Sequence, residues 1–456
     1  MPYTFNTPQD QQDMLTAIGA ASLEELFEQI PAQLHLNRPL DLPAAMSELE
    51  LTQHMTELAE CNEHAGKLVC FLGAGSYDHF IPAVVDAIAS RGEFYTSYTP
   101  YQPEVSQGNL QAMFEYQTLI CQLTGMDVSN ASLYDGGSAV TEAALMCLSV
   151  TKRFGKVIVP ETLHPEYREI LATYFENISA EIVTIPTTDG IVSPADIEKA
   201  IDKNTACVIL QNPNFFGCVE AVQKIADITH EAGALLVLSF DPISLGRLKR
   251  PGDMGVDIAV AEGQSLGSPM AYGGPYLGIM ACRDHFVRRM PGRIAGQTVD
   301  RRGRRCWVLT LQTREQHIRR DKATSNICTN QGLFALRASV YLTALGPRGL
   351  QETGDLCLQK THYAAQEMLR NDRFELAWSQ PFFKEFVIRD RVGKVDVLMA
   401  AAREQGILAG VPLGRWYPEL DDCFLVAVTE QRTCAQIDAL ANCLTTCNDT
   451  KATIHA

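Results

Sequence analysis

The chain has 456 residues, 46% hydrophobic and 20% charged, a balance typical of a globular protein with a sizeable core. Its 54 acidic residues outnumber its 38 lysines and arginines, and the resulting net charge of −16 disfavours nucleic acid as a main partner. The N-terminus has no basic stretch followed by an apolar core, and no apolar run approaches the length a bilayer requires, so we expect a cytoplasmic protein.

The first 65 residues are mostly polar, and their pattern predicts a helical segment that packs on a larger domain. Helices are expected over residues 10–18 and 44–63. Between them, Ser22 is followed three residues later by Glu25, which predicts a capping box at the start of a further helical turn.

Residues 66–330 alternate apolar strands with amphipathic helices, which predicts a large α/β domain. The strands are near-continuous apolar runs, as expected where helices cover both faces of a mainly parallel sheet in a three-layer fold. We expect strands at 131–134, 157–159, 181–185, 207–210, 235–240, 258–261 and 276–281, and helices at 109–124, 138–150, 165–175, 194–201 and 221–232.

Residues 331–456 change in character and predict a small α+β domain. Two helices, 331–345 and 350–369, are separated by Gly346-Pro347. We then expect strands at 382–388 and 424–428, helices at 395–405 and through Leu444, and a frayed tail over residues 448–456.

One stretch of the α/β domain resembles the coenzyme core of fold-type I pyridoxal-phosphate enzymes. A buried strand ends in Asp241, and a second apolar run leads into a small-residue loop, residues 262–275, that closes on Gly-Gly-Pro. The resemblance implies that the aspartate pairs with the pyridine nitrogen of the coenzyme, and that a lysine of the later loop forms a Schiff base with it.

The loop lacks that lysine. There is no lysine between Lys249 and Lys322, and Gln264 stands about where the lysine would fall if the loop is matched back from its Gly-Gly-Pro end. A glutamine amide cannot form an imine with an aldehyde. We therefore expect that this chain binds no coenzyme covalently and that Asp241 is vestigial.

A glycine turn, Gly136-Gly137, leads through Ser138 into the helix expected at 138–150. Free backbone N–H groups at a helix N-terminus suit an anion, such as the phosphate of the coenzyme. The alternative is an ordinary capped helix with Ser138 as N-cap. Because the loop has no lysine, the capped helix is favoured, and the turn is expected to be a vestigial phosphate site.

Residues 95–108 form a proline-interrupted stretch with several tyrosines and polar side chains. This composition suits a loop that lines a ligand, and a surface loop with incidental tyrosines fits it equally well.

Residues 283–322 carry 12 lysines and arginines against four acids. Solvated charge is the usual explanation for such a run, and docking of an acidic protein or a phosphate is the functional one. Its densest part contains Arg301, Arg302, Arg304 and Arg305.

The 14 cysteines show no metal-ligand spacing, so no metal site is expected.

Several motifs together resemble the P-protein of the glycine cleavage system, the pyridoxal-phosphate-dependent glycine decarboxylase. The resemblance spans roughly residues 5–450, nearly the whole chain. It is carried by residues 71–75, 98–108, 130–133, 272–275 and 290–293, and above all by Arg319-Arg-Asp-Lys-Ala-Thr-Ser-Asn-Ile-Cys-Thr-Asn-Gln331.

The resemblance implies that this chain is subunit 1, the N-terminal half of a protein that also occurs as one long chain. Subunit 2 would then carry the coenzyme lysine and bind pyridoxal phosphate, in an α2β2 heterotetramer. The implied reaction decarboxylates glycine and passes the aminomethyl group to the lipoyl arm of H-protein, as glycine dehydrogenase (aminomethyl-transferring).

The resemblance also suggests roles for loop residues of the matched motifs. We expect some of them to form an active-site wall that reaches the partner's coenzyme or lines the path of the lipoyl arm. The candidates for this wall are Tyr98, Tyr101, Gln102, Glu104, Ser106, Thr324, Ser325 and Asn326. The arginines at 301–305 are expected to dock the acidic H-protein.

Two other functions fit the sequence. A stand-alone pyridoxal-phosphate transferase or lyase would need another lysine such as Lys322, which follows Asp241 by some 80 positions instead of about two dozen. A scaffolding or regulatory subunit would have loops that never touch substrate.

Overall fold

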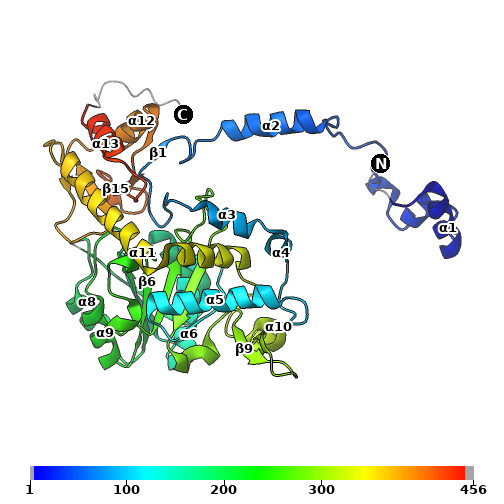
Figure 1. Ribbon diagram of the computed structural model, residues 1–456, viewed down its shortest axis with the longest axis horizontal. Helices are drawn as coiled ribbons and strands as arrows, with labels where there is room; N and C mark the ends of the chain where they lie inside the picture. Colours follow the sequence, from blue (N-terminus) through cyan, green and yellow to red (C-terminus); the bar gives the residue numbers. More distant parts are fainter. Residues whose placement is uncertain (1–4, 188, 447–456) are drawn as a thin grey trace. The chain divides into compact units, whose positions relative to one another are not determined.

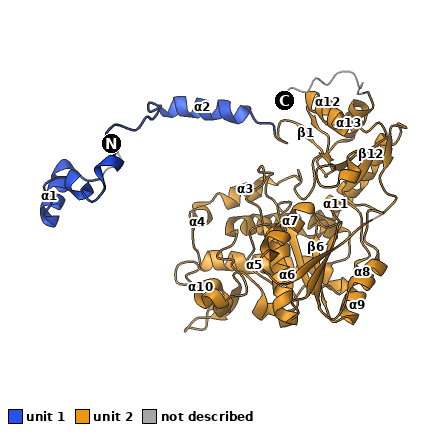
Figure 2. Ribbon diagram, turned by 180° about the vertical axis from the view of Figure 1, so that it is seen from behind, with its two compact units in different colours: residues 1–63 blue, residues 64–456 orange. Residues whose placement is uncertain are grey.

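The computed structural model describes residues 5–187 and 189–446 (Figure 1). Internal contacts divide the chain into two units, residues 1–63 and 64–456, which Figure 2 distinguishes by colour. The tail expected over residues 448–456 lies outside the described residues, and the three expected domains stay predictions.

Unit 1 contains two helices with capping boxes. Helix α1 (Pro8–Ile18) is capped by Thr7, and α2 (Glu48–Glu60) by Ser47, whose side chain and Glu50 accept each other's backbone N–H groups. Two 3-10 turns lie between them, η1 (Glu24–Phe27) and η2 (Ala32–Leu34).

The capping box expected at Ser22 is wrong. The N-cap of η1 is Leu23, which makes no side-chain cap bond, and the Glu25 carboxylate instead accepts the Ala21 N–H at 2.6 Å. The expected helix 44–63 likewise starts later, at Glu48, because Ser47 with Glu50 forms the box.

Unit 1 leaves its apolar side chains exposed. Among its described residues, Leu15 is the only buried hydrophobic one. The segment also has 11 acidic residues against a single arginine, a formal charge of −10. The exposed large hydrophobic residues are Phe5, Met14, Ile18, Leu23, Leu26, Phe27, Ile30, Leu34, Leu36, Leu40, Leu42, Met46, Leu49, Leu51, Met55 and Leu58.

Unit 2 is built on a seven-stranded sheet with strand order β2-β8-β7-β6-β5-β3-β4. Neighbours from β4 to β7 are parallel, whereas β8 is antiparallel to both β7 and β2, so the sheet is mainly parallel as predicted. The strands are β2 (Val128–Ser129), β3 (Lys156–Pro160), β4 (Glu181–Ile185), β5 (Thr205–Asn212), β6 (Leu235–Phe240), β7 (Ile258–Glu262) and β8 (Gly278–Cys282).

Helices cover both faces of this sheet and complete three layers. Along β6, Leu236 and Leu238 belong to one hydrophobic core and Val237 to the other, because successive side chains of a strand point to opposite faces. The core that contains Leu236 is covered by α5 (Gln107–Thr124), α8 (Pro194–Ala200) and α9 (Val222–Glu231), and the other by α6 (Gly136–Thr151) and α7 (Pro165–Phe175).

The strand expected at 131–134 is wrong. Pairing with β8 occurs earlier, at β2, because the backbone at Ser132 (φ 143°) leaves the extended conformation, and only Leu133 forms a further bridge, to Gly278.

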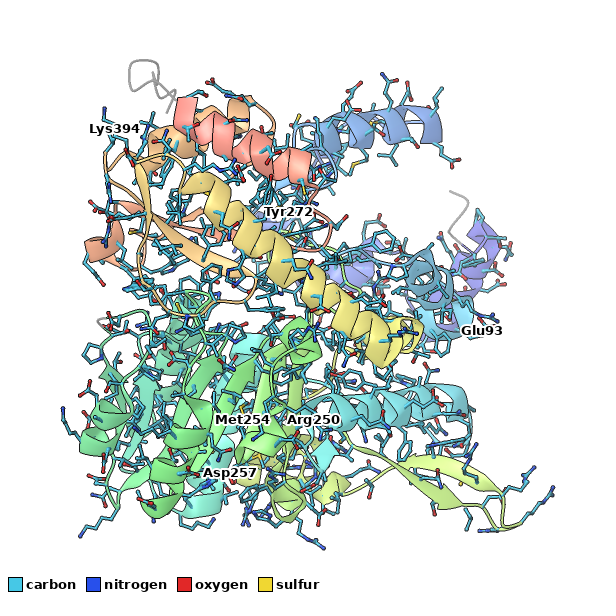
Figure 3. The ribbon with its side chains drawn as sticks, turned by 60° about the vertical axis from the view of Figure 1, so that its left-hand side comes forward. Glu93, Arg250, Met254, Asp257, Tyr272 and Lys394 are labelled. Atoms are coloured by element: carbon cyan, nitrogen blue, oxygen red, sulfur yellow. The ribbon has the colours of Figure 1, made fainter. Side chains whose placement is uncertain are left out.

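The long helix α11 (Gly332–Met368) links the large sheet to a smaller antiparallel one (Figure 3). It kinks at Gly346 (φ 61°, ψ −178°), where two helices were predicted to meet. The small sheet has the order β11-β12-β15-β14, formed by β11 (Phe374–Leu376), β12 (Glu385–Asp390), β15 (Cys423–Ala427) and β14 (Val411–Pro412), with α12 (Val395–Glu404) and α13 (Cys434–Thr446).

Shorter elements complete unit 2. A hairpin that was not predicted, β9 (Ala295–Val299) with β10 (Arg305–Leu309), carries the arginine-rich turn. No helix of the described residues is long and apolar enough to span a membrane. The remaining elements are β1 (Val69–Cys70), which pairs with β13 (Ile407–Leu408), α3 (Ala83–Ala89), α4 (Gly92–Tyr95), α10 (Gln316–Arg319), and the 3-10 turns η3 (Ile243–Gly246), η4 (Pro251–Met254), η5 (Asp284–Arg289), η6 (Gln312–Arg314), η7 (Arg320–Lys322) and η8 (Pro418–Leu420).

Candidate functional site

Asp241, at the carboxyl end of β6, already has a cationic partner within the chain. The ammonium nitrogen of Lys384 lies 2.9 Å from its Oδ2 atom, and Lys384 is only 2% exposed. The same ammonium lies 3.5 Å from the centroid of the Tyr77 ring and 3.0 Å from Nε2 of His79. Lys384 therefore occupies the position at which the sequence pattern predicts a coenzyme ring nitrogen.

Gln264 is a buried structural residue. Its Oε1 accepts the Tyr77 N–H at 2.9 Å, and its Nε2 donates to the carbonyls of Tyr77 (3.1 Å) and Ser268 (2.7 Å). The Tyr77 hydroxyl in turn donates to Glu385 at 2.8 Å. Both ends of the Gln264 amide are thus used to hold the buried Tyr77.

The N-terminus of α6 is neutralised by carboxylates of the chain itself. Asp135 is its N-cap and accepts the Ser138 N–H at 2.7 Å, so the expectation that Ser138 caps the helix is wrong. Glu262 accepts the Gly136 N–H at 2.9 Å, and burial raises the pKa of Glu262 to about 7. Two donors that would suit a phosphate are therefore already used.

A tyrosine ring fills the space beside this helix start. Tyr167 stacks on His164 with a centroid distance of 4.4 Å and an interplanar angle of 18°. A Cβ atom at Gly136 would lie 2.4 Å from the Tyr167 hydroxyl, so only glycine permits the contact.

The cavity between these groups has a volume of only about 30 Å³. That is about the space of one water molecule, against several hundred Å³ for pockets that bind small molecules. Pyridoxal phosphate therefore does not fit this site. The lining includes Tyr77, His164, Tyr167, Asp241, Glu262 and Lys384.

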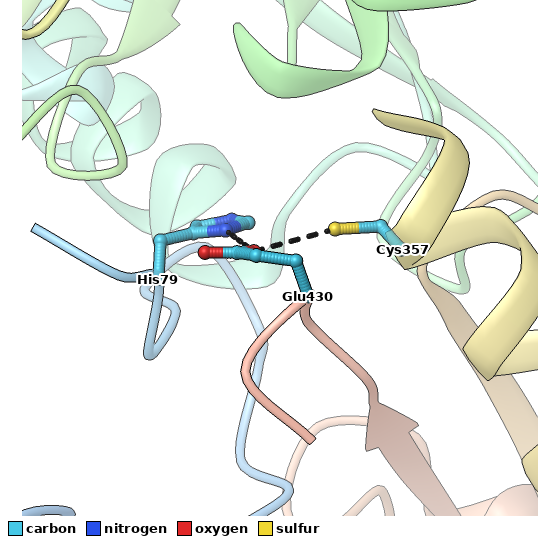
Figure 4. Close-up of side chains that lie close together, drawn as sticks. All are labelled: His79, Cys357 and Glu430. Carbon is cyan, nitrogen blue, oxygen red and sulfur yellow. Dashed lines mark hydrogen bonds and ion pairs between the residues drawn. The ribbon is translucent and has the colours of Figure 1, made fainter. Parts of the chain in front are cut away.

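A further cluster of potential metal ligands adjoins Lys384. His79, Cys357 and Glu430 come from distant segments, and their ligand atoms lie within 4.8 Å of one another (Figure 4). Nδ1 of His79 lies 2.7 Å from Glu430, and Nε2 faces the Lys384 ammonium, which can only donate. A metal on Nδ1 would put the imidazole proton against that ammonium, so the geometry favours a hydrogen-bonded network over a metal centre.

The predicted wall is partly assembled around a second pocket of about 140 Å³. Tyr98 is 93% exposed at its edge, and the half-buried Tyr101 donates to Oδ1 of Asn330 at 2.6 Å. The Tyr101 hydroxyl also lies 3.0 Å from Oγ1 of Thr329. The structure thus brings the 95–108 loop against the segment that precedes α11.

The other predicted wall residues are arranged differently. Gln102, Glu104 and Asn326 are exposed, and Ser106 is buried at the start of α5. Thr324 is half-buried, and Ser325 accepts the Ile327 N–H at 3.1 Å. The pocket lining includes Tyr98 and Tyr101 from the prediction, together with residues that it missed: Phe94, Asn109, Thr329 and Asn330.

The arginine patch lies on the exposed turn of the β9–β10 hairpin. Arg304 pairs with Asp300 at 2.9 Å, and the guanidinium of Arg305 lies 5.1 Å from the centroid of the Trp307 ring. Beside it, α3, α5 and α11 border an apolar groove of about 830 Å³ that Arg305 and Trp307 also line.

Comparisons with known proteins agree on one family. Residues 2–444 match the family model described as glycine cleavage system P-protein. The chain is 53% identical to "Probable glycine dehydrogenase (decarboxylating) subunit 1" of Desulforamulus reducens, covering 97% of this chain and 98% of the relative. It is 51% identical to the protein of the same name from Carboxydothermus hydrogenoformans, covering 97% and 99%.

Solved structures give the same result. The crystal structure of glycine decarboxylase (P-protein) of the glycine cleavage system, in inhibitor-bound form, superposes with a TM-score of 0.90 and 43% identity, over 98% of this chain and 99% of that one. A sphingosine-1-phosphate lyase of Burkholderia pseudomallei, 15% identical with a TM-score of 0.66 over 91% and 94% of the two chains, shares the fold alone.

Proposed function

The chain belongs to the glycine cleavage system P-protein family, and we propose that it works as subunit 1 of glycine dehydrogenase (decarboxylating) with a second subunit that holds the coenzyme. The complex decarboxylates glycine and transfers the aminomethyl group to the lipoyl arm of H-protein. Pyridoxal phosphate supplies, when bound, the electron sink for the loss of CO2.

One observation supports the proposal that the second subunit, and not this chain, holds the coenzyme. The site of this chain is closed to about 30 Å³, with Lys384 on Asp241 and Glu262 on the helix start. This observation supports the proposal that the second subunit binds the coenzyme. We propose an α2β2 heterotetramer, following the family resemblance.

The wall is the part of this chain that we expect to face the partner's site. Tyr98 is almost fully exposed, although burial of a tyrosine ring is energetically favourable. With Tyr101, Thr329 and Asn330 it offers hydroxyl and amide groups around a small pocket. These groups would orient glycine or the lipoyl arm and exclude water once the second subunit covers them.

The composition of unit 1 also supports the proposal that this chain has an obligate partner. Its exposed leucines, isoleucines, methionines and phenylalanines form far more apolar surface than a stable monomeric segment leaves uncovered. Its formal charge of −10 favours a partner surface that combines apolar and basic residues.

Reconstitution tests the proposal. This chain alone, mixed with pyridoxal phosphate and reduced with borohydride, should give no stoichiometric adduct on any single lysine and no carboxyl exchange into glycine. Addition of the second subunit should start the exchange, and Tyr98→Ala should lower its kcat. Full exchange with Tyr98→Ala, Tyr101→Ala and Asn326→Ala together would instead indicate a scaffolding subunit.

A further inference from the structure

Arg293 joins three segments of the wall that lie far apart in the sequence. Its guanidinium carbon lies 4.8 Å from the centroid of the Tyr101 ring, and its Nη2 donates to the Cys328 carbonyl at 2.9 Å. Its Nη1 pairs with the Glu315 carboxylate. Arg293 is 8% exposed and Glu315 is 6% exposed, so these contacts are shielded from water.

Two of these contacts lead directly to the 140 Å³ pocket. Tyr101 lines the pocket and donates to Asn330, and Cys328 stands two residues before Asn330 in the chain. A shift of the guanidinium would therefore move both sides of the pocket. The third contact, with Glu315, fixes the guanidinium itself.

A further side chain contacts the Arg293 guanidinium. Nη1 lies 3.1 Å from Nδ1 of His317, whose side chain is partly exposed, and Nδ1 lies 3.7 Å from Glu315. The backbone carbonyl of Arg293 accepts the Ala131 N–H at 2.8 Å. The residue is therefore held by its main chain and by its side chain.

We propose that Arg293 is the positioning residue of the wall, holding the Tyr98–Tyr101 loop against residues 328–330 so that Tyr98 is presented to the partner's site. This inference rests on the proposed function, which gives the wall something to face. An arginine is needed because one planar group must cover a ring with its face and reach a carboxylate and a carbonyl with separate N–H groups. A lysine could keep the pair with Glu315 alone.

The first test uses the isolated full chain and needs no coenzyme. Chymotrypsin cleavage after Tyr98, followed by mass spectrometry, should be about fivefold or more faster in Arg293→Lys, with the Tm changed by less than about 2 °C. Arg415→Lys is the matched control, because Arg415 also covers a ring, that of Trp416 at 4.9 Å. It should match the wild type.

A second variant approaches the contact from its other side. Tyr101→Leu removes the ring that the guanidinium covers and leaves the Arg293–Glu315 pair in place, so no buried charge loses its partner. It should release the loop at least as much as Arg293→Lys does, because it also removes the hydroxyl that donates to Asn330. Tyr101→Phe, which removes that hydroxyl and keeps the ring under the guanidinium, isolates the effect of the hydroxyl. The double variant Arg293→Lys with Tyr101→Leu should release the loop less than the sum of the two single effects, because both changes break the contact between the guanidinium and the ring.

The reconstituted complex provides the second readout. Arg293→Lys should lower kcat about 10- to 100-fold and change KM for glycine less than about threefold. The reason is that the variant keeps Tyr98 and Tyr101 but no longer holds them in position. Unchanged cleavage and unchanged kcat would overturn the inference, as would a general rise in cleavage with a lowered Tm. The two proposals can fail separately. If the wild-type complex shows no carboxyl exchange, the proposed function is wrong. If Arg293→Lys still releases the loop in that case, Arg293 nevertheless anchors Tyr101.

Discussion

Lys384 and Asp241 form a buried ion pair, with 2.9 Å between Nζ and Oδ2, although 142 residues separate them in the sequence. Lys384 directly precedes strand β12 of the small sheet, and Asp241 directly follows strand β6 of the large sheet. The pair therefore fastens the small sheet to the large one at the site where the family fold would hold a coenzyme.

Breaking this pair should destabilise the chain. Lys384→Met leaves the Asp241 carboxylate without its cation, and we expect the free energy of unfolding to fall by about 3–5 kcal/mol. Lys384→Met combined with Asp241→Asn should recover much of that loss. Urea unfolding checks both variants, with Arg91→Met as control, because the Arg91–Glu93 pair is exposed (Glu93 is labelled in Figure 3). Equal losses in the single and double variants would contradict the prediction.

Glu142 should make stability depend on pH. Burial raises its pKa from 4.5 to about 7, and a hydrogen bond from Ser325 opposes this only in part. The folded chain thus holds the proton more tightly than the unfolded chain, so this contribution is present below about pH 4.5 and lost as the pH rises through about 7.

Glu142→Gln removes that titration. At pH 8 the variant should be more stable than the wild type by up to about 3 kcal/mol, and at pH 5 the two should be similar. Unfolding free energies at several pH values check this, and the exposed Glu176→Gln should leave the profile unchanged. A difference that does not vary with pH would contradict the prediction.

Restoring the missing amine alone should not restore coenzyme binding. Gln264→Lys breaks the three hydrogen bonds to Tyr77 and Ser268, and the cavity stays at about 30 Å³. We expect no borohydride-stable adduct on residue 264 after incubation with pyridoxal phosphate. An adduct on residue 264 would show that Tyr77 and Lys384 give way to the coenzyme.

The exposed leucines of unit 1 should contribute to assembly. Leu34, Leu42 and Leu49 are 71%, 70% and 79% exposed, so replacing them with serine should leave the Tm of the isolated chain unchanged. If the partner covers them, each replacement should weaken association about tenfold or more. Sedimentation of the mixed subunits measures this, with the exposed Val392→Ser as control. Unchanged association would exclude these side chains from the interface.

The hairpin arginines should steer the carrier. Arg301→Glu with Arg302→Glu should raise the apparent KM for H-protein about tenfold and flatten its dependence on salt, because the attraction between opposite charges is screened by ions. Arg348→Glu, whose side chain is 93% exposed elsewhere on the chain, should change neither. A wild-type KM that is insensitive to salt would rule out this docking surface.

The pattern of apolar runs predicted most of the large sheet, because strands covered on both faces need apolar residues at every position. It did not predict the β9–β10 hairpin, whose strands are short and mix buried residues, Ala295, Trp307 and Leu309, with exposed ones such as Val299 and Arg305. Nor could it predict the partner of Asp241, since Lys384 is ordinary in its own segment and meets the aspartate only through the fold.

The sequence predicted some residues of the candidate site and missed others. Gln264 was identified because the motif around it fixes its position, and Tyr98 and Tyr101 because their loop is rich in aromatics. Arg293 has no local signal beyond the Met-Pro-Gly-Arg motif. Its role depends on contacts with three separate segments, which only the folded chain brings together.

The lysine at Asp241 also has a consequence for how this chain would respond to vitamin supply. A protein that binds a ligand only when folded becomes more stable as the ligand concentration rises. A second subunit that holds vitamin B6 would follow this rule and weaken during shortage. This chain, which carries its own cation and carboxylate at those positions, would fold to the same extent whether the vitamin is abundant or scarce.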